Sequence, residues 1–233
     1  MYSLYKNIKA GCKSLLFISL VAYISFFVTR IYFKPDIPHK TIMSVIDSSV
    51  HYKVNFSKDG LDYYATCTGV VLDNTPDFAL VATAKHCIKE GSPSYVEGIL
   101  VEKVIVHDTR DLALVILSEK IPHKYPAKRP SEEHTVFSNI FHIGFPGGVT
   151  LYSQGKTLAQ SFKIDVGLLH VIKGCSGGGV FNQEGELIGI AVMTAPPLGL
   201  YESYRGFISF LAAQDIDSLK LEIKSNKYMS RIK

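Results

Sequence analysis

Apolar positions recur along most of the chain in short runs that turn residues separate. From about Met43 the chain alternates apolar and polar residues in "VHYKVNF", and "SKDG" then predicts a turn. Two series of apolar runs follow: "YYATCTGVVL", "FALVATAKHC", "YVEGILVEKVIVHD" and "DLALVILS", and then "TVFSNIFHIGF", "VTLYSQGKTLAQ", "FKIDVGLLHVI", "GVFNQ", "ELIGIAVMT" and "YRGFISFLAA". Many short strands without long helices between them are typical of an all-β barrel or sandwich.

A basic, proline-rich segment around 120–133 divides the two series. We therefore expect two similar halves, a first barrel at about 43–120 and a second at about 134–212. The basic residues of "PHKYPAKRP" within the dividing segment are expected to form a solvated connection. The tail "AAQDIDSLKLEIKSNKY" carries apolar residues at helical spacing, which predicts one C-terminal helix at about 212–225.

The N-terminus departs from this strand pattern. Residues 1–13 are basic, and the uncharged run "SLLFISLVAYISFFV" continues through "TRIYF" to give an apolar segment at 14–33. Its length approaches the roughly 20 residues of a membrane-spanning helix. A cleaved signal peptide is the alternative, but no small-x-small cleavage site follows. We expect an uncleaved signal anchor, then a linker at 34–42 and a soluble domain at 43–233. Lysines and arginines on both sides leave the orientation open.

Composition narrows the choice of function. The net charge of +4 over 233 residues is too small and too scattered to indicate nucleic-acid binding. The four cysteines form neither a C-x-x-C pair nor a Cys/His zinc spacing, so we expect no structural metal. No cofactor is expected either.

Ser176 lies among glycines in "GCSGGG", which raises the question of a nucleophile on a tight turn. The frame also fits the G-x-S-x-G elbow of α/β-hydrolases, but that fold needs a histidine after the serine and the last histidine is His170. A subtilisin-like order needs helices and a parallel sheet that this pattern does not supply. The order that fits is histidine, aspartate, serine, with His86 in "VATAKHC" and Asp111 at the head of "DLALVIL".

Each candidate has a physical reason. A carboxylate at the head of a buried strand needs a partner, and the ring N–H of a histidine can supply one. Asp108 competes with Asp111, but the apolar run begins only after Asp111. The glycines around Ser176 let the chain bend so that the N–H groups of Gly174 and Ser176 can bind a developing oxyanion.

These segments together resemble a known family. "TAKHC", "RDLALVIL" and "GCSGGGVFN" are similar, in order and spacing, to the three active-site segments of trypsin-like (chymotrypsin-fold) serine proteases. "FHIGFPGG" (141–148) and "GELIGI" are closest in pattern to the HtrA/Deg-like branch, and "GFISF" (206–210) resembles its strand beside the substrate cleft. The resemblance covers about 43–225 and implies a double six-stranded antiparallel β-barrel. Since the chain stops soon after "FISFL", we expect no PDZ domain.

The resemblance also implies a mechanism. His86 is the general base, Asp111 orients it, and Ser176 attacks the scissile carbonyl to form an acyl-enzyme. Gly174 and Ser176 supply the oxyanion hole. The implied activity is that of a serine endopeptidase whose partners are protein or peptide substrates and, through the anchor, a membrane. Relatives of the HtrA type form trimers, but no sequence feature here indicates an oligomer.

The resemblance further implies a disulfide between Cys67 and Cys87, which indicates an oxidising compartment. The catalytic domain is therefore expected outside the cytoplasm, in the periplasm if the host is a Gram-negative bacterium.

Three expectations concern the surroundings of Ser176. His170, six residues earlier, either lines the primary specificity pocket or points elsewhere, and Phe207 and Ile208 are expected beside the substrate. Cys175 stands where zymogens of the family carry an aspartate, and we expect it to pack as a small residue under the turn. Two rival functions stay open: a catalytically inactive relative that binds peptides or a partner protein, and a cysteine protease that uses Cys175.

Overall fold

The computed structural model describes residues 37–130, 135–161, 164–195 and 198–230. All of them belong to one compact unit that spans Asp36–Lys233. The basic segment and the anchor predicted at 14–33 lie outside the described residues. None of the helices in the described ranges is long and apolar enough to cross a membrane.

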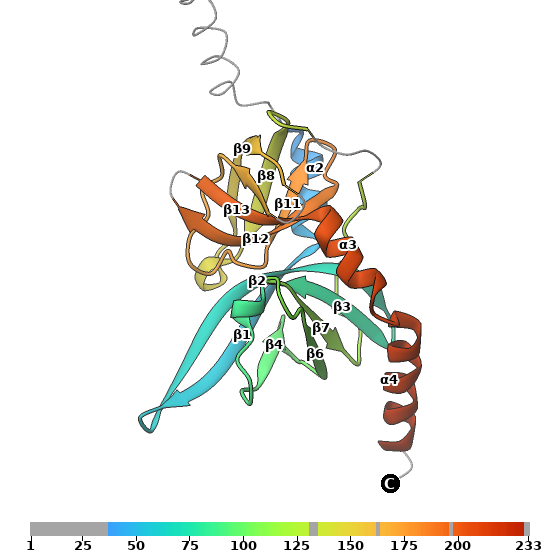
Figure 1. The fold of residues 1–233 in the computed structure, drawn as a ribbon. Coiled ribbons are helices and arrows are strands. Elements are labelled where there is room, and N and C mark those ends of the chain that lie inside the picture. Colours follow the sequence, from blue (N-terminus) through green and yellow to red (C-terminus); the bar gives the residue numbers. More distant parts are fainter. Residues whose placement is uncertain (1–36, 131–134, 162–163, 196–197, 231–233) are drawn as a thin grey trace, which may run out of the picture. The chain divides into compact units, whose positions relative to one another are not determined.

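The first half of the unit is an antiparallel sheet of seven strands in the order β5-β4-β1-β2-β3-β7-β6 (Figure 1). The strands are β1 (Ser49–Lys58), β2 (Leu61–Thr75), β3 (Phe78–Thr83), β4 (Ser94–Val96), β5 (Ile99–Leu100), β6 (Lys103–Val106) and β7 (Ala113–Leu117). Strands β1 and β2 pair over ten residues, from Ser49 opposite Val70 to Lys58 opposite Leu61. Their hairpin therefore reaches beyond the other strands of the sheet (Figure 1).

The second half is a closed six-stranded barrel in the order β10-β13-β12-β11-β8-β9. Its strands are β8 (Asn139–Gly144), β9 (Leu151–Ala159), β10 (Ile164–Gly167), β11 (Gly179–Asn182), β12 (Leu187–Ala195) and β13 (Leu198–Ser203). The expected closed six-stranded barrel is therefore confirmed for this half. It is wrong for the first half, whose sheet is curled but open. The edge strands β5 and β6 have two and four residues, so neither offers the length of backbone that closure requires.

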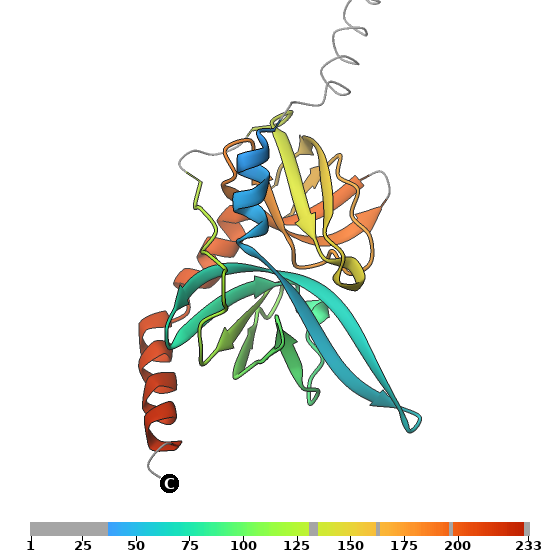
Figure 2. The ribbon, with the colours of Figure 1, turned by 180° about the vertical axis from the view of Figure 1, so that it is seen from behind.

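Helices and short helical turns complete the described part of the chain. They are α2 (His39–Ile46), η1 (Lys85–Cys87), η2 (Pro146–Gly148), α3 (Tyr204–Ala212) and α4 (Ile216–Ser230). Helix α2 crosses the boundary predicted at 42/43 and lies beside the barrel (Figure 2), with Thr41 and Val45 close to Gly185 of the β11–β12 turn. Val45 is buried there. Ile37, within the region read as a linker, is also buried in the hydrophobic core, so that region contributes to the core.

Helix α3 replaces the strand expected at 206–210. Phe207 and Phe210 are buried and Leu211 is partly buried, and this i, i+3, i+4 spacing places all three on one helical face. Helix α4 then occupies the place of the predicted C-terminal helix.

The two halves share one hydrophobic core. Val70 and Leu114 of the first sheet belong to the same cluster of buried side chains as Phe141 and Ile190 of the barrel, together with Phe207 of α3. Because protein interiors pack as densely as organic crystals, such a shared core holds the two halves in one arrangement. Residues from both halves can therefore form a rigid site.

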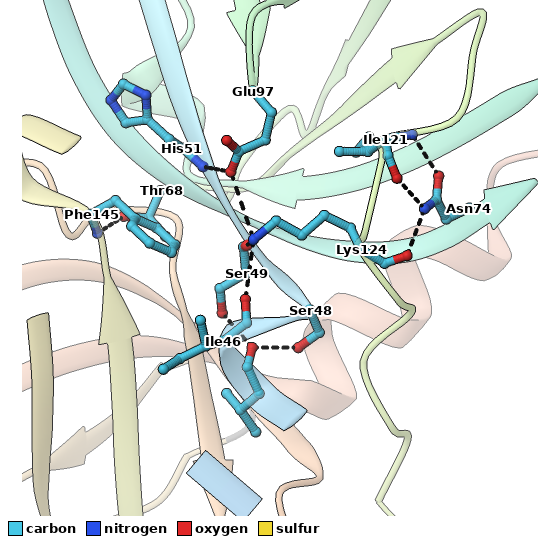
Figure 3. Close-up of polar contacts among 11 residues, drawn as sticks. Ile46, Ser48, Ser49, His51, Thr68, Asn74, Glu97, Ile121, Lys124 and Phe145 are labelled. Atoms are coloured by element: carbon cyan, nitrogen blue, oxygen red, sulfur yellow. Dashed lines mark hydrogen bonds and ion pairs between the residues drawn. The ribbon is translucent and has the colours of Figure 1, made fainter. Parts of the chain in front are cut away.

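The connection between the halves is held by polar contacts rather than solvated (Figure 3). The Lys124 ammonium donates to the carbonyls of Ser49 at 2.6 Å and Ile46 at 3.3 Å, and its side chain is only 16% exposed. The Asn74 side chain donates to the carbonyls of Ile121 and Lys124 and accepts from the Ile121 N–H. The prediction of a solvated connection is therefore wrong for Lys124.

Candidate active site

His86 and Asp111 meet at one end of the first sheet. Strands β3 and β7 are antiparallel neighbours, and Thr83 at the end of β3 pairs with Ala113 at the start of β7. The residues after β3 and before β7 consequently lie together. His86 Nδ1 is 2.7 Å from Asp111 Oδ2, and the His86 backbone N–H donates to Asp111 Oδ1 at 2.9 Å. The carboxylate thus holds both the ring and the backbone of the histidine.

The pair is only partly shielded from solvent. The side chains of His86 and Asp111 are 47% and 33% exposed, so the expected burial of Asp111 is only partial. The hydrogen bond that His86 donates to Asp111 raises the pKa of His86, against a smaller opposing effect of burial. Burial acts to raise the pKa of Asp111, but hydrogen bonds from His86 and from the Lys85 backbone together hold it below its ordinary value. Both shifts favour a carboxylate beside a histidine that binds protons readily.

Ser176 lies in a turn between β10 and β11. The Cys175 N–H donates to the Ile172 carbonyl at 3.0 Å, and Gly174 has φ +95°, which is typical of the third residue of a type II turn. The Gly178 N–H donates back to the Cys175 carbonyl at 3.0 Å. Within the described part of the chain, no hydrogen bond uses the N–H of Gly174 or of Ser176. The N–H groups of Gly174 and Ser176 therefore have no hydrogen-bond acceptor among the described residues.

The Ser176 turn is held against the first sheet, close to the segment of His86. The Thr68 N–H of β2 donates to the Ser176 carbonyl at 2.9 Å. The same carbonyl oxygen lies 3.7 Å from the sulfur of Cys87, the neighbour of His86 in η1. Cys87 is joined by a disulfide to Cys67 of β2, as the resemblance implied. The three predicted catalytic residues thus come from segments that contact one another.

Gly177 shows how closely the turn approaches the sheet. A Cβ atom at this position would lie 2.1 Å from Thr83 Oγ1 and 2.2 Å from the Thr68 carbonyl oxygen, and φ is +85°. Both the contact and the backbone conformation require glycine.

The Asp111 segment has a second support, which comes from the barrel. The Asp111 N–H donates to Glu202 Oε1 of β13 at 3.3 Å, and Arg110 Nη1 lies 3.8 Å from Glu202 Oε2. The side chains of Arg110 and Glu202 are 9% and 3% exposed. A glutamate from the barrel therefore positions a segment of the first sheet. The sequence carries no local signal for a contact between residues 91 positions apart.

Cys175 and His142 lie behind the turn, inside the barrel. Cys175 is completely buried, as predicted, and burial raises the pKa of its thiol. The His142 ring is also completely buried, its Nδ1 contacts the Gly179 carbonyl at 2.9 Å, and burial lowers its pKa to about 4. A Cβ at Gly144 would lie within 3 Å of both Cys175 Sγ and His142 Nε2, so the two side chains are close neighbours.

The residues predicted to line the substrate pocket have different surroundings. His170 is exposed in the segment before the turn, where its N–H donates to Ser153 Oγ at 2.7 Å. Phe207 is 1% exposed and packs in the core, and Ile208 borders a cavity formed with Leu72 and Leu187. Neither His86 nor Ser176 lines that cavity, and the placement of Phe207 and Ile208 beside the substrate stays a prediction. The described residues contain no cluster of acidic, histidine or cysteine side chains that could hold a metal ion.

Comparisons with known proteins agree with this architecture. The Rv3671c protein of M. tuberculosis H37Rv, crystallised as an inactive serine-to-alanine mutant, has a TM-score of 0.60 at 17% identity over 77% of this chain and 95% of that one. The inactive form of the Rv3671c protease has a TM-score of 0.62 at 18% identity over 77% and 96%. At this identity the similarity shows the fold alone. No curated protein sequence matches the chain.

The sequence profile described as the trypsin-like peptidase domain matches residues 67–190, more than half of the chain. The matched range includes His86, Asp111 and Ser176. The chain therefore belongs to the trypsin-like peptidase family.

Proposed function

We propose that the chain is a serine endopeptidase in which His86, Asp111 and Ser176 form the catalytic triad. One observation carries the proposal: the hydrogen-bonded His86–Asp111 pair lies next to a turn that presents Ser176 together with two unoccupied backbone donors. A general base, its orienting carboxylate, a nucleophile and an oxyanion site are the groups that acyl transfer needs.

Each group has a defined step. His86 accepts the proton of the Ser176 hydroxyl through Nε2, because the contact with Asp111 keeps the other ring proton on Nδ1. The Ser176 oxygen attacks the scissile carbonyl, and the N–H groups of Gly174 and Ser176 stabilise the negative charge on the carbonyl oxygen. His86 then protonates the leaving amine. Water, activated by the same imidazole, hydrolyses the acyl-enzyme and regenerates Ser176.

The rivals fit the site less well. Burial raises the pKa of Cys175 and leaves it without access to solvent, and both are unfavourable for a thiolate nucleophile. An inactive peptide-binding relative has no need of a carboxylate that is hydrogen-bonded to both the ring Nδ1 and the backbone N–H of His86. The Ser176 reaction is therefore the better-supported function.

We further propose that residues 14–33 anchor the chain in a membrane and that the catalytic domain lies outside the cytoplasm. The disulfide between Cys67 and Cys87 supports an oxidising compartment. Labelling of intact cells with a membrane-impermeant amine reagent tests this topology. We expect modification of the catalytic domain in intact cells. Modification only after lysis would contradict the extracytoplasmic placement.

A fluorophosphonate probe tests the catalytic proposal. We expect a single adduct on Ser176 in the full chain, absent in Ser176→Ala and lost in His86→Ala, and hydrolysis of unfolded casein that follows the same pattern. A thiol-selective adduct on Cys175 that accompanies casein cleavage would instead support the cysteine protease. A folded chain that neither labels nor cleaves would support the binding module.

A further inference from the structure

We propose that Thr68 is a positioning residue whose hydroxyl holds the Ser176 turn in the shape that leaves the N–H groups of Gly174 and Ser176 available. The proposal rests on the proposed function, because it concerns the oxyanion site of that reaction. Thr68 follows Cys67 in β2 and belongs to the first sheet, whereas the turn belongs to the barrel.

The polar groups of Thr68 are all in use. The side chain is completely buried, and Oγ1 donates to the Gly174 carbonyl at 2.8 Å. The same oxygen accepts the Phe145 N–H at 2.8 Å, the contact drawn in Figure 3. The Thr68 backbone N–H donates to the Ser176 carbonyl at 2.9 Å. A hydroxyl has one proton to donate, so the contact with Gly174 takes the entire donor capacity of this side chain.

These contacts hold the carbonyl side of two peptide groups whose N–H side, at Cys175 and at Gly177, is also hydrogen-bonded. Glycine adopts positive and negative φ with similar ease, so Gly174 at φ +95° has little intrinsic preference for the observed conformation. With its carbonyl held by Thr68 Oγ1, rotation of the Gly174–Cys175 peptide breaks a part-buried hydrogen bond in addition to the one that the Cys175 N–H donates to Ile172. The Thr68 N–H holds the Ser176 carbonyl in the same way. Both carbonyls are directed toward Thr68, and the N–H groups of the same two residues stay unpaired.

The hydroxyl also couples the turn to a third segment. Phe145 connects β8 to η2 in the barrel. The next residue, Pro146, packs against Gly174, because a Cβ atom added at Gly174 would lie 2.7 Å from Pro146 Cα. Thr68 itself is held by Thr83, whose hydroxyl donates to the Thr68 carbonyl at 2.8 Å. One buried oxygen therefore links β2, the Ser176 turn and the Phe145 segment. Preorganised donors are effective because no reorganisation accompanies the reaction.

The test compares three variants of the full chain in detergent micelles. Thr68→Val keeps the shape and removes the hydroxyl, and Thr68→Ser keeps the hydroxyl. Thr157→Val is the matched control, because Thr157 is an equally buried threonine on β9, where its hydroxyl lies 3.3 Å from that of Tyr201. The measurements are kcat and KM on p-nitrophenyl acetate and casein, the rate of fluorophosphonate labelling, the melting temperature, and hydrogen exchange of the peptide covering 172–178.

We expect Thr68→Val to lower kcat and the labelling rate by about 10- to 100-fold, which approaches the effect of losing one oxyanion donor, while KM changes by less than about twofold. Hydrogen exchange at 172–178 should accelerate in the same variant. Thr68→Ser should restore kcat to within about threefold, and Thr157→Val should lower the melting temperature without lowering kcat.

The proposal is overturned if Thr68→Val keeps the wild-type kcat, if Thr68→Ser fails to restore it, or if Thr157→Val lowers kcat equally. If the wild type neither cleaves casein nor labels at Ser176, the proposed function fails. Hydrogen exchange still decides the positioning role in that case, since unchanged exchange at 172–178 in Thr68→Val contradicts it whatever the activity.

Discussion

Asp111 accepts two hydrogen bonds from His86, one from the ring Nδ1 at 2.7 Å and one from the backbone N–H at 2.9 Å. The bond to the ring determines which ring nitrogen carries the proton. The bond to the backbone N–H fixes the position of the His86 backbone and so of its ring. Because the carboxylate contacts the ring Nδ1 and the backbone nitrogen of His86, it fixes both the tautomer and the position of the proposed base.

Asp111→Asn is expected to lower kcat by roughly 10,000-fold with little change in stability, because an amide in place of the carboxylate favours the wrong tautomer of His86. Kinetics on casein and a melting curve measure the two effects. Asp108→Asn is the matched control, since no side-chain contact joins Asp108 to His86 in the described residues. Equal losses in both variants would show that Asp111 has no special role.

The activity is expected to rise with pH through a midpoint above 6.5. Neutral His86 is the reactive form, and the hydrogen bond that it donates to Asp111 raises its pKa above the ordinary value of about 6.5. As pH falls through this raised pKa, His86 becomes protonated and cannot accept the Ser176 proton. The residual activity of Asp111→Asn should show its midpoint at lower pH. A kcat/KM profile from pH 5 to 9 measures both midpoints, and identical midpoints would contradict the assignment.

Gly177→Ala is expected to abolish labelling of Ser176 and to lower the melting temperature. Its Cβ would lie 2.1 Å from Thr83 Oγ1 and 2.2 Å from a backbone oxygen, so the turn must move away from the sheet. Gly98→Ala is the matched control, because Gly98 has φ +84° and no atom within 4 Å of the added Cβ. Gly98→Ala should carry only the backbone cost of about 1 kcal/mol and should keep full labelling.

Removal of the disulfide by a Cys67→Ser/Cys87→Ser double substitution is expected to lower the free energy of unfolding by about 3 kcal/mol, the size typical for a closed loop of this length. Urea denaturation measures this loss. Reduction with dithiothreitol should destabilise the wild type by a similar amount and leave the double variant unchanged. Insensitivity of the wild type to reduction would indicate that the disulfide does not form in solution.

Stability is expected to fall as pH drops from about 6.5 toward 4. Burial lowers the pKa of His142 to about 4, so the folded state keeps this ring neutral while the unfolded state binds a proton near pH 6.5. The full free energy of unfolding is therefore present above pH 6.5. It decreases as pH falls, by on the order of 2–3 kcal/mol at pH 4.5. Urea denaturation at pH 7 and 4.5 measures the loss. The loss between pH 7 and 4.5 should be smaller in His142→Leu than in the wild type. It should be unchanged in His170→Ala, which removes an exposed ring.

Several parts of the fold were accessible from local patterns alone. The strand series was predicted because "FALVAT" and "ALVIL" are apolar runs bounded by turn residues, and both are buried strands in the structure. The helix at 204–212 was misread because "GFISF" fits a short apolar strand as well as one face of a helix. Only the packing of Phe207 and Phe210 against the shared core separates the two.

The sequence by itself determined the identity and order of the proposed catalytic residues, because each lies in a short segment with its own signal: His86 after an apolar strand, Asp111 before one, and Ser176 among glycines. Tertiary structure alone decided which residues support them. Thr68 contacts Gly174 across 106 positions and Glu202 reaches the Asp111 segment across 91. Neither contact leaves a local pattern, since hydrogen bonds between distant segments depend on how the sheet and the barrel pack. The open first sheet has the same cause, because closure depends on the pairing of distant edge strands rather than on the pattern within any one of them.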